Sequence, residues 1–126
     1  PTVCDTGHNV GGWEDIARQL RLEWPEEGTW RMVIGMVADK DIDSVLALMP
    51  KEATYYFTQA SVSRAMQCDV FAAKAAEHGL QGKVYTTVGE AVRAAQQEAA
   101  QTDALFIGGS TFVVADALPL FPEAIK

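Results

Sequence analysis

The residues of this sequence best suited to chemistry stand near its start, where Asp5, His8 and Asn9 follow a short apolar stretch. Gly11 and Gly12 come next, and an amphipathic helix is expected to follow them. A helix N-terminus offers unpaired N–H groups and the positive end of a dipole, so an anion such as a phosphate suits this place. Two interpretations stay open on the pattern alone. Either Asp5 and His8 contact a nucleotide, or the segment is a strand-to-helix turn in which Asn9 caps the helix.

A second candidate lies near the other end of the chain, where Gly108, Gly109 and Ser110 follow an apolar stretch and precede a helix. The glycines would let a ligand approach the backbone closely, and Ser110 would donate a hydrogen bond to that ligand. The alternative is a tight connection in which Ser110 caps the next helix. The pattern favours this alternative, because it matches neither G-x-G-x-x-G nor a Walker A loop.

Two cations complete the set of candidates. Lys40 lies between Asp39 and Asp41, a pattern that favours a solvated turn over a ligand contact. Arg64 lies in a polar loop, where its guanidinium could bind a carboxylate through two parallel hydrogen bonds or simply face solvent. The sequence has no Ser/His/Asp set with the spacing of a nucleophilic site and no Cys/His cluster that suits zinc. We therefore assign no catalytic and no metal-ligating residue to this chain.

Short apolar runs alternate with amphipathic or alanine-rich stretches, which indicates strands alternating with helices. The expected strands are Thr2–Asp5, Trp30–Val37, Ala53–Gln59, Lys83–Thr86 and Asp103–Gly108. The expected helices are Gly12–Glu23, Ile42–Met49, Cys68–His78, Val88–Gln101 and Thr111–Leu118. Asp41, Thr87 and Ser110 are the expected N-caps of the second, fourth and fifth helices. This order predicts an α/β fold with a mostly parallel sheet and right-handed crossovers. Ligands of such sheets bind beyond the carboxyl ends of the strands, and all four candidate segments follow predicted strands.

Composition narrows the class of protein. The chain has 126 residues, 48% of them hydrophobic, which predicts one folded domain over residues 1–126. The net charge of −7 and the lack of a basic stripe argue against nucleic acid and anionic membranes as partners. No apolar run reaches the ~20 residues that span a bilayer. Cys4 and Cys68 lack ligand spacing, and we expect two reduced thiols in or near the core of a cytoplasmic protein.

Four stretches resemble one family in order and spacing. Residues 5–9 (Asp-Thr-Gly-His-Asn) resemble the Asp-Gly-Ala-His-Asn signature of folylpolyglutamate synthase and the bifunctional dihydrofolate synthase, members of the Mur ligase superfamily. Residues 35–41 are similar to the family's Gly-x-x-x-Asp-Lys-Asp segment. Residues 60–65 are similar to its Pro-Arg-Ala loop, with Ser63 where proline is usual, and residues 108–110 to its terminal Gly-Ser motif. The likeness covers essentially the whole chain, but only the C-terminal domain of the enzyme.

The resemblance implies a three-layer, Rossmann-like domain of about five mostly parallel strands flanked by helices. Enzymes of this family use ATP and Mg²⁺ to phosphorylate a folate or dihydropteroate carboxylate, and the amino group of glutamate attacks the acyl phosphate. Carried over to this sequence, the nucleotide side of the site consists of Asp5, His8 and Asn9. The substrate side consists of Ser110, Arg64 and Lys40. The P-loop and most metal ligands belong to an N-terminal domain, the expected partner of this chain in one polypeptide.

Two consequences of the resemblance can be tested. The isolated chain should lack ligase activity, because it carries half of the site. The family domain has a further edge strand before the position of Pro1, so this chain would expose a strand edge and form weak homodimers. Two other functions stay open: the C-terminal domain of another Mur-type ligase, or a stand-alone, non-catalytic nucleotide-binding or interaction module. Tight binding of Mg-ATP by the chain alone would favour the module.

Overall fold

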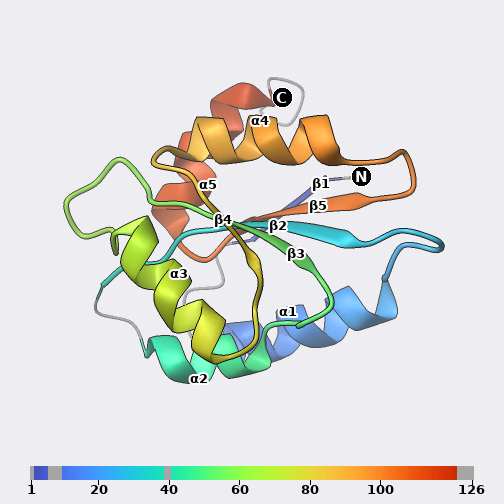
Figure 1. Ribbon diagram of the computed structural model, residues 1–126, viewed down its shortest axis with the longest axis horizontal. Coiled ribbons are helices and arrows are strands. Elements are labelled where there is room, and N and C mark those ends of the chain that lie inside the picture. The colour runs from blue at the N-terminus through green and yellow to red at the C-terminus, as the bar shows by residue number, and fades with distance from the viewer. Residues whose placement is uncertain (1, 6–9, 39–40, 122–126) are drawn as a thin grey trace.

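The centre of the fold is a five-stranded sheet, seen between two layers of helices in the computed structural model (Figure 1). The structure describes residues 2–5, 10–38 and 41–121. The strands are β1 (Thr2–Asp5), β2 (Trp30–Ile34), β3 (Thr54–Phe57), β4 (Gly82–Val84) and β5 (Ala104–Gly108). They lie in the order β1-β5-β2-β3-β4, and every pair is parallel. The predicted α/β fold with a parallel sheet of about five strands is confirmed.

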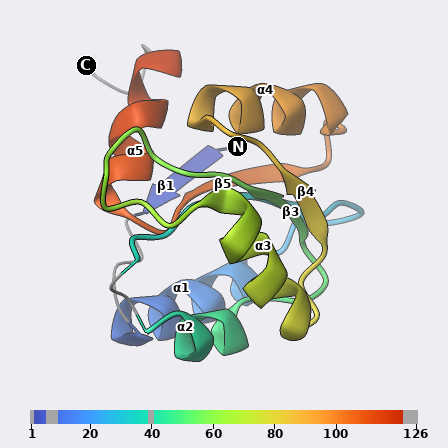
Figure 2. The same ribbon diagram turned by 60° about the vertical axis from the view of Figure 1, so that its left-hand side comes forward.

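Helices cover both faces of the sheet, as Figures 1 and 2 show. Three of them pack on one face: α1 (Val10–Leu22), α2 (Ile42–Leu48) and α3 (Cys68–Glu77). Two pack on the other face, α4 (Val88–Glu98) and α5 (Thr111–Ala117), and a short 3₁₀ turn (Leu118–Leu120) follows α5. Each face therefore has its own apolar core, which is the arrangement expected for a parallel sheet.

Alternation along the central strands builds these two cores. Met32 and Ile34 of β2 face the core under α1, α2 and α3, whereas Val33 between them faces the core under α4 and α5. In β5, Phe106 and Ile107 divide in the same way. All five of the β5 residues are buried, so the strand reads as one apolar run in the sequence. Burial of one such large side chain stabilises the fold by roughly 1.5–3 kcal/mol.

Helix starts match the expected capping residues. The side chains of Asp41, Thr87 and Ser110 each accept a hydrogen bond from a backbone N–H in the first turn of α2, α4 and α5. Gly79 follows α3 with a φ of +80°, the left-handed conformation that ends many helices. These local signals are specific, and α2, α3, α4 and α5 begin at the predicted residues, whereas α1 begins at Val10, two residues before the predicted Gly12.

Several predicted strand bounds were wrong, because an apolar stretch can be buried without being part of a strand. β2 ends at Ile34 instead of continuing to Val37. Met36 and Val37 are still buried, but Val37 forms an isolated antiparallel bridge with Ala65 outside the sheet. β3 is likewise shorter than predicted, and β4 starts one residue earlier, at Gly82.

The alanine-rich helix α4 ends at Glu98, three residues before the predicted end at Gln101. Nothing in an alanine-rich stretch signals a stop. The stop comes instead from Asp103, whose carboxylate accepts a hydrogen bond from the backbone N–H of Ala100 at 2.9 Å. This contact turns the chain toward β5.

The two cysteines differ in environment. Cys68 is buried at the start of α3, as expected, but Cys4 is exposed, so the prediction of a second core thiol was wrong. The reason is that β1 is a short strand at the end of the sheet with all four residues exposed. Within the described residues, no helix is long and apolar enough to cross a membrane.

Candidate functional site

The register of the sheet aligns the carboxyl ends of four strands in one row. Asp5 pairs with Gly108, Gly108 pairs with Ile34, and Ile34 pairs with Phe57. The chain segments that leave β1, β5, β2 and β3 therefore start side by side at one edge of the sheet. In parallel sheets this carboxyl edge is where ligands bind. We call it the carboxyl edge, defined by Asp5, Gly108, Ile34 and Phe57.

Asp5 is the last residue of β1 and is exposed. It lines a hollow of about 320 Å³ between β1 and α1. Apolar side chains of the same hollow include Ile16 of α1, Trp30 of β2 and Phe106 of β5. An exposed carboxylate at a strand end, beside an apolar wall, can accept a hydrogen bond from a ribose hydroxyl while a flat ring packs nearby.

Ser110 lies in a crowded turn between β5 and α5. Its hydroxyl oxygen accepts a hydrogen bond from the N–H of Val113 at 3.1 Å, and the residue is 2% exposed. Gly109 before it has a φ of +98°, and a Cβ there would collide with the carbonyl oxygen of Gly35. Glycine is thus required at position 109 because the backbone at Gly35 lies too close for a side chain. The expected cap is present, and a role for Ser110 in substrate binding stays a prediction.

Arg64 is exposed on the loop between β3 and α3. Its guanidinium carbon lies 6.0 Å from the centre of the Phe112 ring, in the first turn of α5. This distance is within the range of a cation–π contact. The backbone of Arg64 is fixed as well, because its carbonyl oxygen accepts the N–H of Ala38 at 2.9 Å. The loop thus brings Arg64 to the helix that Ser110 begins.

The structure therefore brings three of the six predicted site residues to the carboxyl edge: Asp5 at the end of β1, Ser110 after β5, and Arg64 against α5. The other three, His8, Asn9 and Lys40, lie outside the described residues. Among residues 2–5, 10–38 and 41–121, no group of three His, Cys, Asp or Glu side chains is placed to hold a metal ion.

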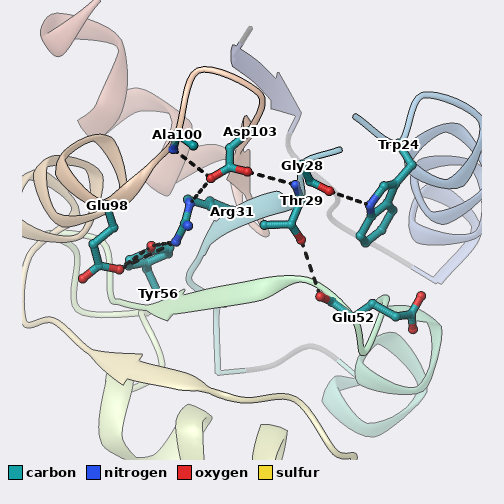
Figure 3. Close-up of polar contacts among 9 residues, drawn as sticks. All are labelled: Trp24, Gly28, Thr29, Arg31, Glu52, Tyr56, Glu98, Ala100 and Asp103. Atoms are coloured by element: carbon teal, nitrogen blue, oxygen red, sulfur yellow. Dashed lines mark hydrogen bonds and ion pairs between the residues drawn. The ribbon is translucent and has the colours of Figure 1, made fainter. Parts of the chain in front are cut away.

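A second polar cluster lies at the opposite edge, where the strands begin, and sequence reasoning missed it (Figure 3). Arg31 of β2 donates hydrogen bonds to Asp103 at 2.8 Å and to the hydroxyl of Tyr56 at 2.8 Å. The Tyr56 hydroxyl donates in turn to Glu98 at 2.7 Å. Asp103 also accepts the N–H of Thr29 at 3.0 Å. We call Arg31, Tyr56, Glu98 and Asp103 the amino-edge network.

Ionisation in this network follows from its contacts. Burial alone would raise the pKa of Asp103, but hydrogen bonds from the Ala100 amide, the Arg31 side chain and the Thr29 amide outweigh it. The pKa of Asp103 therefore lies below its ordinary value. Burial, followed by the hydrogen bond to Glu98, raises the pKa of Tyr56 to about 12 against the lowering effect of Arg31, so the phenol keeps its proton at neutral pH.

Sequence reasoning also missed two residues of α5 that touch the Arg64 loop. Phe112 lies under the Arg64 guanidinium, and Asp116 accepts two hydrogen bonds from Ser61. The available signal was an aromatic and an acidic residue spaced four apart on the helix that follows the Gly-Ser motif, which places both on one helical face.

Comparison with known proteins agrees with this geometry. The family described as Mur ligase, glutamate ligase domain, matches residues 1–111 of the chain. E. coli FolC in complex with DHPP and ADP is similar over 99% of this chain, with 26% identity and a TM-score of 0.83. The bifunctional folylpolyglutamate synthase/dihydrofolate synthase from Yersinia pestis, complexed with AMPPNP and Mn, is similar over 96%, with 25% identity and a TM-score of 0.81.

A third structure, of a bifunctional folylpolyglutamate synthase/dihydrofolate synthase with Mn, AMPPNP and L-glutamate bound, has 26% identity and a TM-score of 0.76 over 92% of this chain. The chain spans only 29%, 28% and 28% of the lengths of these three proteins. No curated protein sequence matches it. The fold, the motifs and the match over most of its length establish that the chain belongs to the Mur ligase family and corresponds to its glutamate ligase domain.

Proposed function

We propose that this chain is the C-terminal domain of a cytoplasmic, ATP-dependent ligase that adds L-glutamate to a folate or dihydropteroate carboxylate through an acyl phosphate. The observation that carries the proposal is the carboxyl edge, where Asp5, Ser110 and Arg64 come from three separate connections of one sheet. The similarity to FolC over 99% of the chain supports the folate branch. The family description itself names a glutamate ligase domain.

Each of these three residues has a role that its chemistry allows. The exposed Asp5 carboxylate accepts a hydrogen bond from the nucleotide, together with His8 and Asn9 of the same motif. Arg64 pairs with a substrate carboxylate, for which a guanidinium offers two parallel donors. Ser110 begins α5 beside Arg64 and lies at the amino-acid end of the site, and Lys40 adds a cation on the substrate side.

Amide ligation of this kind depends on positioning. ATP, the co-substrate, supplies the phosphoryl group that activates the carboxylate. The residues of this chain hold the nucleotide and the incoming amino acid in place while a second domain closes over them and excludes water. Following the family resemblance, we assign Mg²⁺ to the N-terminal P-loop domain and derive no step of this chain through it.

The test compares this chain alone with the same chain joined to the sequence that precedes it in its gene. We expect glutamate-dependent ADP formation, with a dihydropteroate or folate acceptor, only from the longer protein. In that protein, Asp5→Asn should raise the KM for ATP, and Glu77→Ala, at the exposed end of α3, is the matched control. Turnover by the chain alone, or no glutamate-dependent turnover by the longer protein, would contradict the proposal.

The same preparations separate this function from that of a stand-alone nucleotide-binding module. A half-site should bind Mg-ATP weakly, so calorimetry on the chain alone should detect little heat at micromolar concentrations. A submicromolar Kd would favour the module instead. The exposed β1 edge also leads us to propose weak homodimers, for which light scattering should give a mass that rises with concentration.

A further inference from the structure

The loop that carries Arg64 is tied to α5 at its start. Ser61 donates two hydrogen bonds to Asp116, from its backbone N–H to one carboxylate oxygen at 2.8 Å and from its hydroxyl to the other at 3.0 Å. The two carboxylate oxygens of Asp116 thus accept from the two donors of Ser61. These bonds join positions 55 residues apart in the sequence.

The same loop is tied to the segment after β2 at its end. Val37 and Ala65 form an antiparallel bridge, and the N–H of Met66 donates to the carbonyl oxygen of Met36 at 2.8 Å. Together with the bond from Ala38 to the Arg64 carbonyl, these contacts fix the backbone on the far side of Arg64. The loop therefore has one anchor on each side of Arg64, and Figure 2 shows it running beside α5.

Phe112 and Asp116 lie one helical turn apart on α5, so one face of this helix meets both the start of the loop and the Arg64 guanidinium. The helix itself begins at Ser110, whose position is set by the crowded turn at Gly109. As a result, the Gly-Ser turn and Arg64, which arrive from different strands, share one rigid support.

From this arrangement we propose that Asp116 is a positioning residue, which orients Arg64 toward a carboxylate of the substrate by holding Ser61. This rests on the proposed function, because it assigns the carboxylate to the ligase substrate. Asp116 acts through the loop and does not touch the substrate itself. The acid is suited to the task, since a carboxylate offers two acceptors, whereas an asparagine would turn one of them into a donor facing Ser61.

The first arm of the test uses this chain and needs no ligase activity. Heteronuclear ¹⁵N NOE values for residues 61–65 are compared between the wild type, Asp116→Ala, Asp116→Asn and Ser61→Ala. We expect the loop values to fall most in Asp116→Ala and less in Ser61→Ala, which keeps its backbone N–H, while the sheet residues keep theirs. The double variant should match Asp116→Ala, because both changes remove the same contact. Unchanged loop values in Asp116→Ala would overturn the proposal.

The second arm measures steady-state kinetics in the intact ligase that contains this domain. In Asp116→Ala the KM for the carboxylate substrate contacted by Arg64 should rise about fivefold, which corresponds to about 1 kcal/mol, with the KM for ATP nearly unchanged. Arg64→Ala should show the same split, more strongly, and Asp116→Ala should add little to it. Glu77→Ala on the far end of α3 serves as the charge control.

If Asp116 has only a structural role, Asp116→Ala will lower the amount of active enzyme but leave the KM values for ATP and for the carboxylate substrate unchanged. That result would overturn the positioning role. Ser61→Ala loses one hydroxyl only, so it still gives a readout if Asp116→Ala fails to fold. An intact protein without any ligase activity would refute the proposed function. In that case the NMR arm would still decide whether Asp116 holds the loop.

Discussion

The two edges of the sheet differ in how far their charged side chains are exposed to solvent. At the amino edge, Arg31, Tyr56 and Asp103 bond to one another and to nearby backbone, and the Asp103 side chain is only 6% exposed. At the carboxyl edge, Asp5 and Arg64 end exposed on segments that leave the sheet. The amino edge therefore holds its charges inside the fold, and we propose that the carboxyl edge presents Asp5 and Arg64 to a ligand.

Physical chemistry explains the difference. A buried charge is tolerated only when it is paired and hydrogen-bonded, so the amino-edge network must stay complete. An exposed charge costs little to maintain and lies within reach of a ligand. Changes at the amino edge should therefore lower stability, and changes at the carboxyl edge should affect ligand binding more than stability, except where the backbone itself is crowded.

The largest effect is expected for Arg31→Met, which keeps much of the side-chain length and removes the charge. Asp103 would stay buried with backbone donors alone, at a cost of about 3 kcal/mol in the free energy of unfolding. Urea denaturation measures this value. A loss below about 1 kcal/mol in the free energy of unfolding would mean that the amino-edge network contributes little to stability and that the two edges do not differ in this respect.

The next effect is expected at the carboxyl edge, from Gly109→Ala. The φ of +98° and the collision with the Gly35 carbonyl should together cost about 2 kcal/mol. The matched control is Gly89→Ala inside α4, where a Cβ meets only a flexible arginine end at 3.7 Å, so stability should rise by about 0.5–1 kcal/mol. Equal effects at the two glycines would contradict the account of the turn.

A smaller effect is expected for Ser110→Ala, which removes the cap of α5. The loss should be about 1 kcal/mol, and Ser110→Gly should recover most of it, since glycine at an N-cap costs little and adds no volume or charge to this buried turn. Thermal unfolding of the three proteins gives the comparison. Should Ser110→Gly restore stability while ligase activity stays low in the intact enzyme, Ser110 has a second role besides capping.

How much the sequence predicts can be judged from these same residues. Within the described part of the chain, the alternation of apolar and amphipathic segments predicts all five strands and all five α-helices, and Asp41, Thr87 and Ser110 mark helix starts correctly. Such signals are local, because capping and periodicity depend on residues within one turn or one strand. Strand ends were harder to predict, because Met36 and Val37 are apolar residues that are buried outside the sheet.

Contacts between distant segments could not be predicted from one sequence. Arg31 and Asp103 are 72 residues apart, and Ser61 and Asp116 are 55 apart, so no periodicity links them. The same limit applies to the site. Asp5, Ser110 and Arg64 lie at one edge as expected, whereas the contacts of Asp116 and Phe112 with the loop depend on how α5 packs against it, which no motif indicates.

The smallest effect is expected from acid. Because the pKa of Asp103 is lowered in the folded state, its contribution to stability is complete above the unfolded pKa of about 3.9 and is lost as the pH falls through the lower folded value. The stability gap between wild type and Arg31→Met should therefore narrow below about pH 4. Urea denaturation midpoints of both proteins between pH 6 and pH 2.5 test this. A stability difference that stays constant over this range would show that the ion pair between Arg31 and Asp103 does not stabilise the fold.

The most direct test of the contrast between the edges is an NMR titration of this chain with Mg-ATP and then with L-glutamate. We expect weak binding, with amide shifts confined to the carboxyl edge around Asp5, Arg64 and Ser110, and with Arg31 and Asp103 unchanged. Shifts concentrated at the amino-edge network, or spread evenly over both edges, would show that the carboxyl edge is not the ligand site.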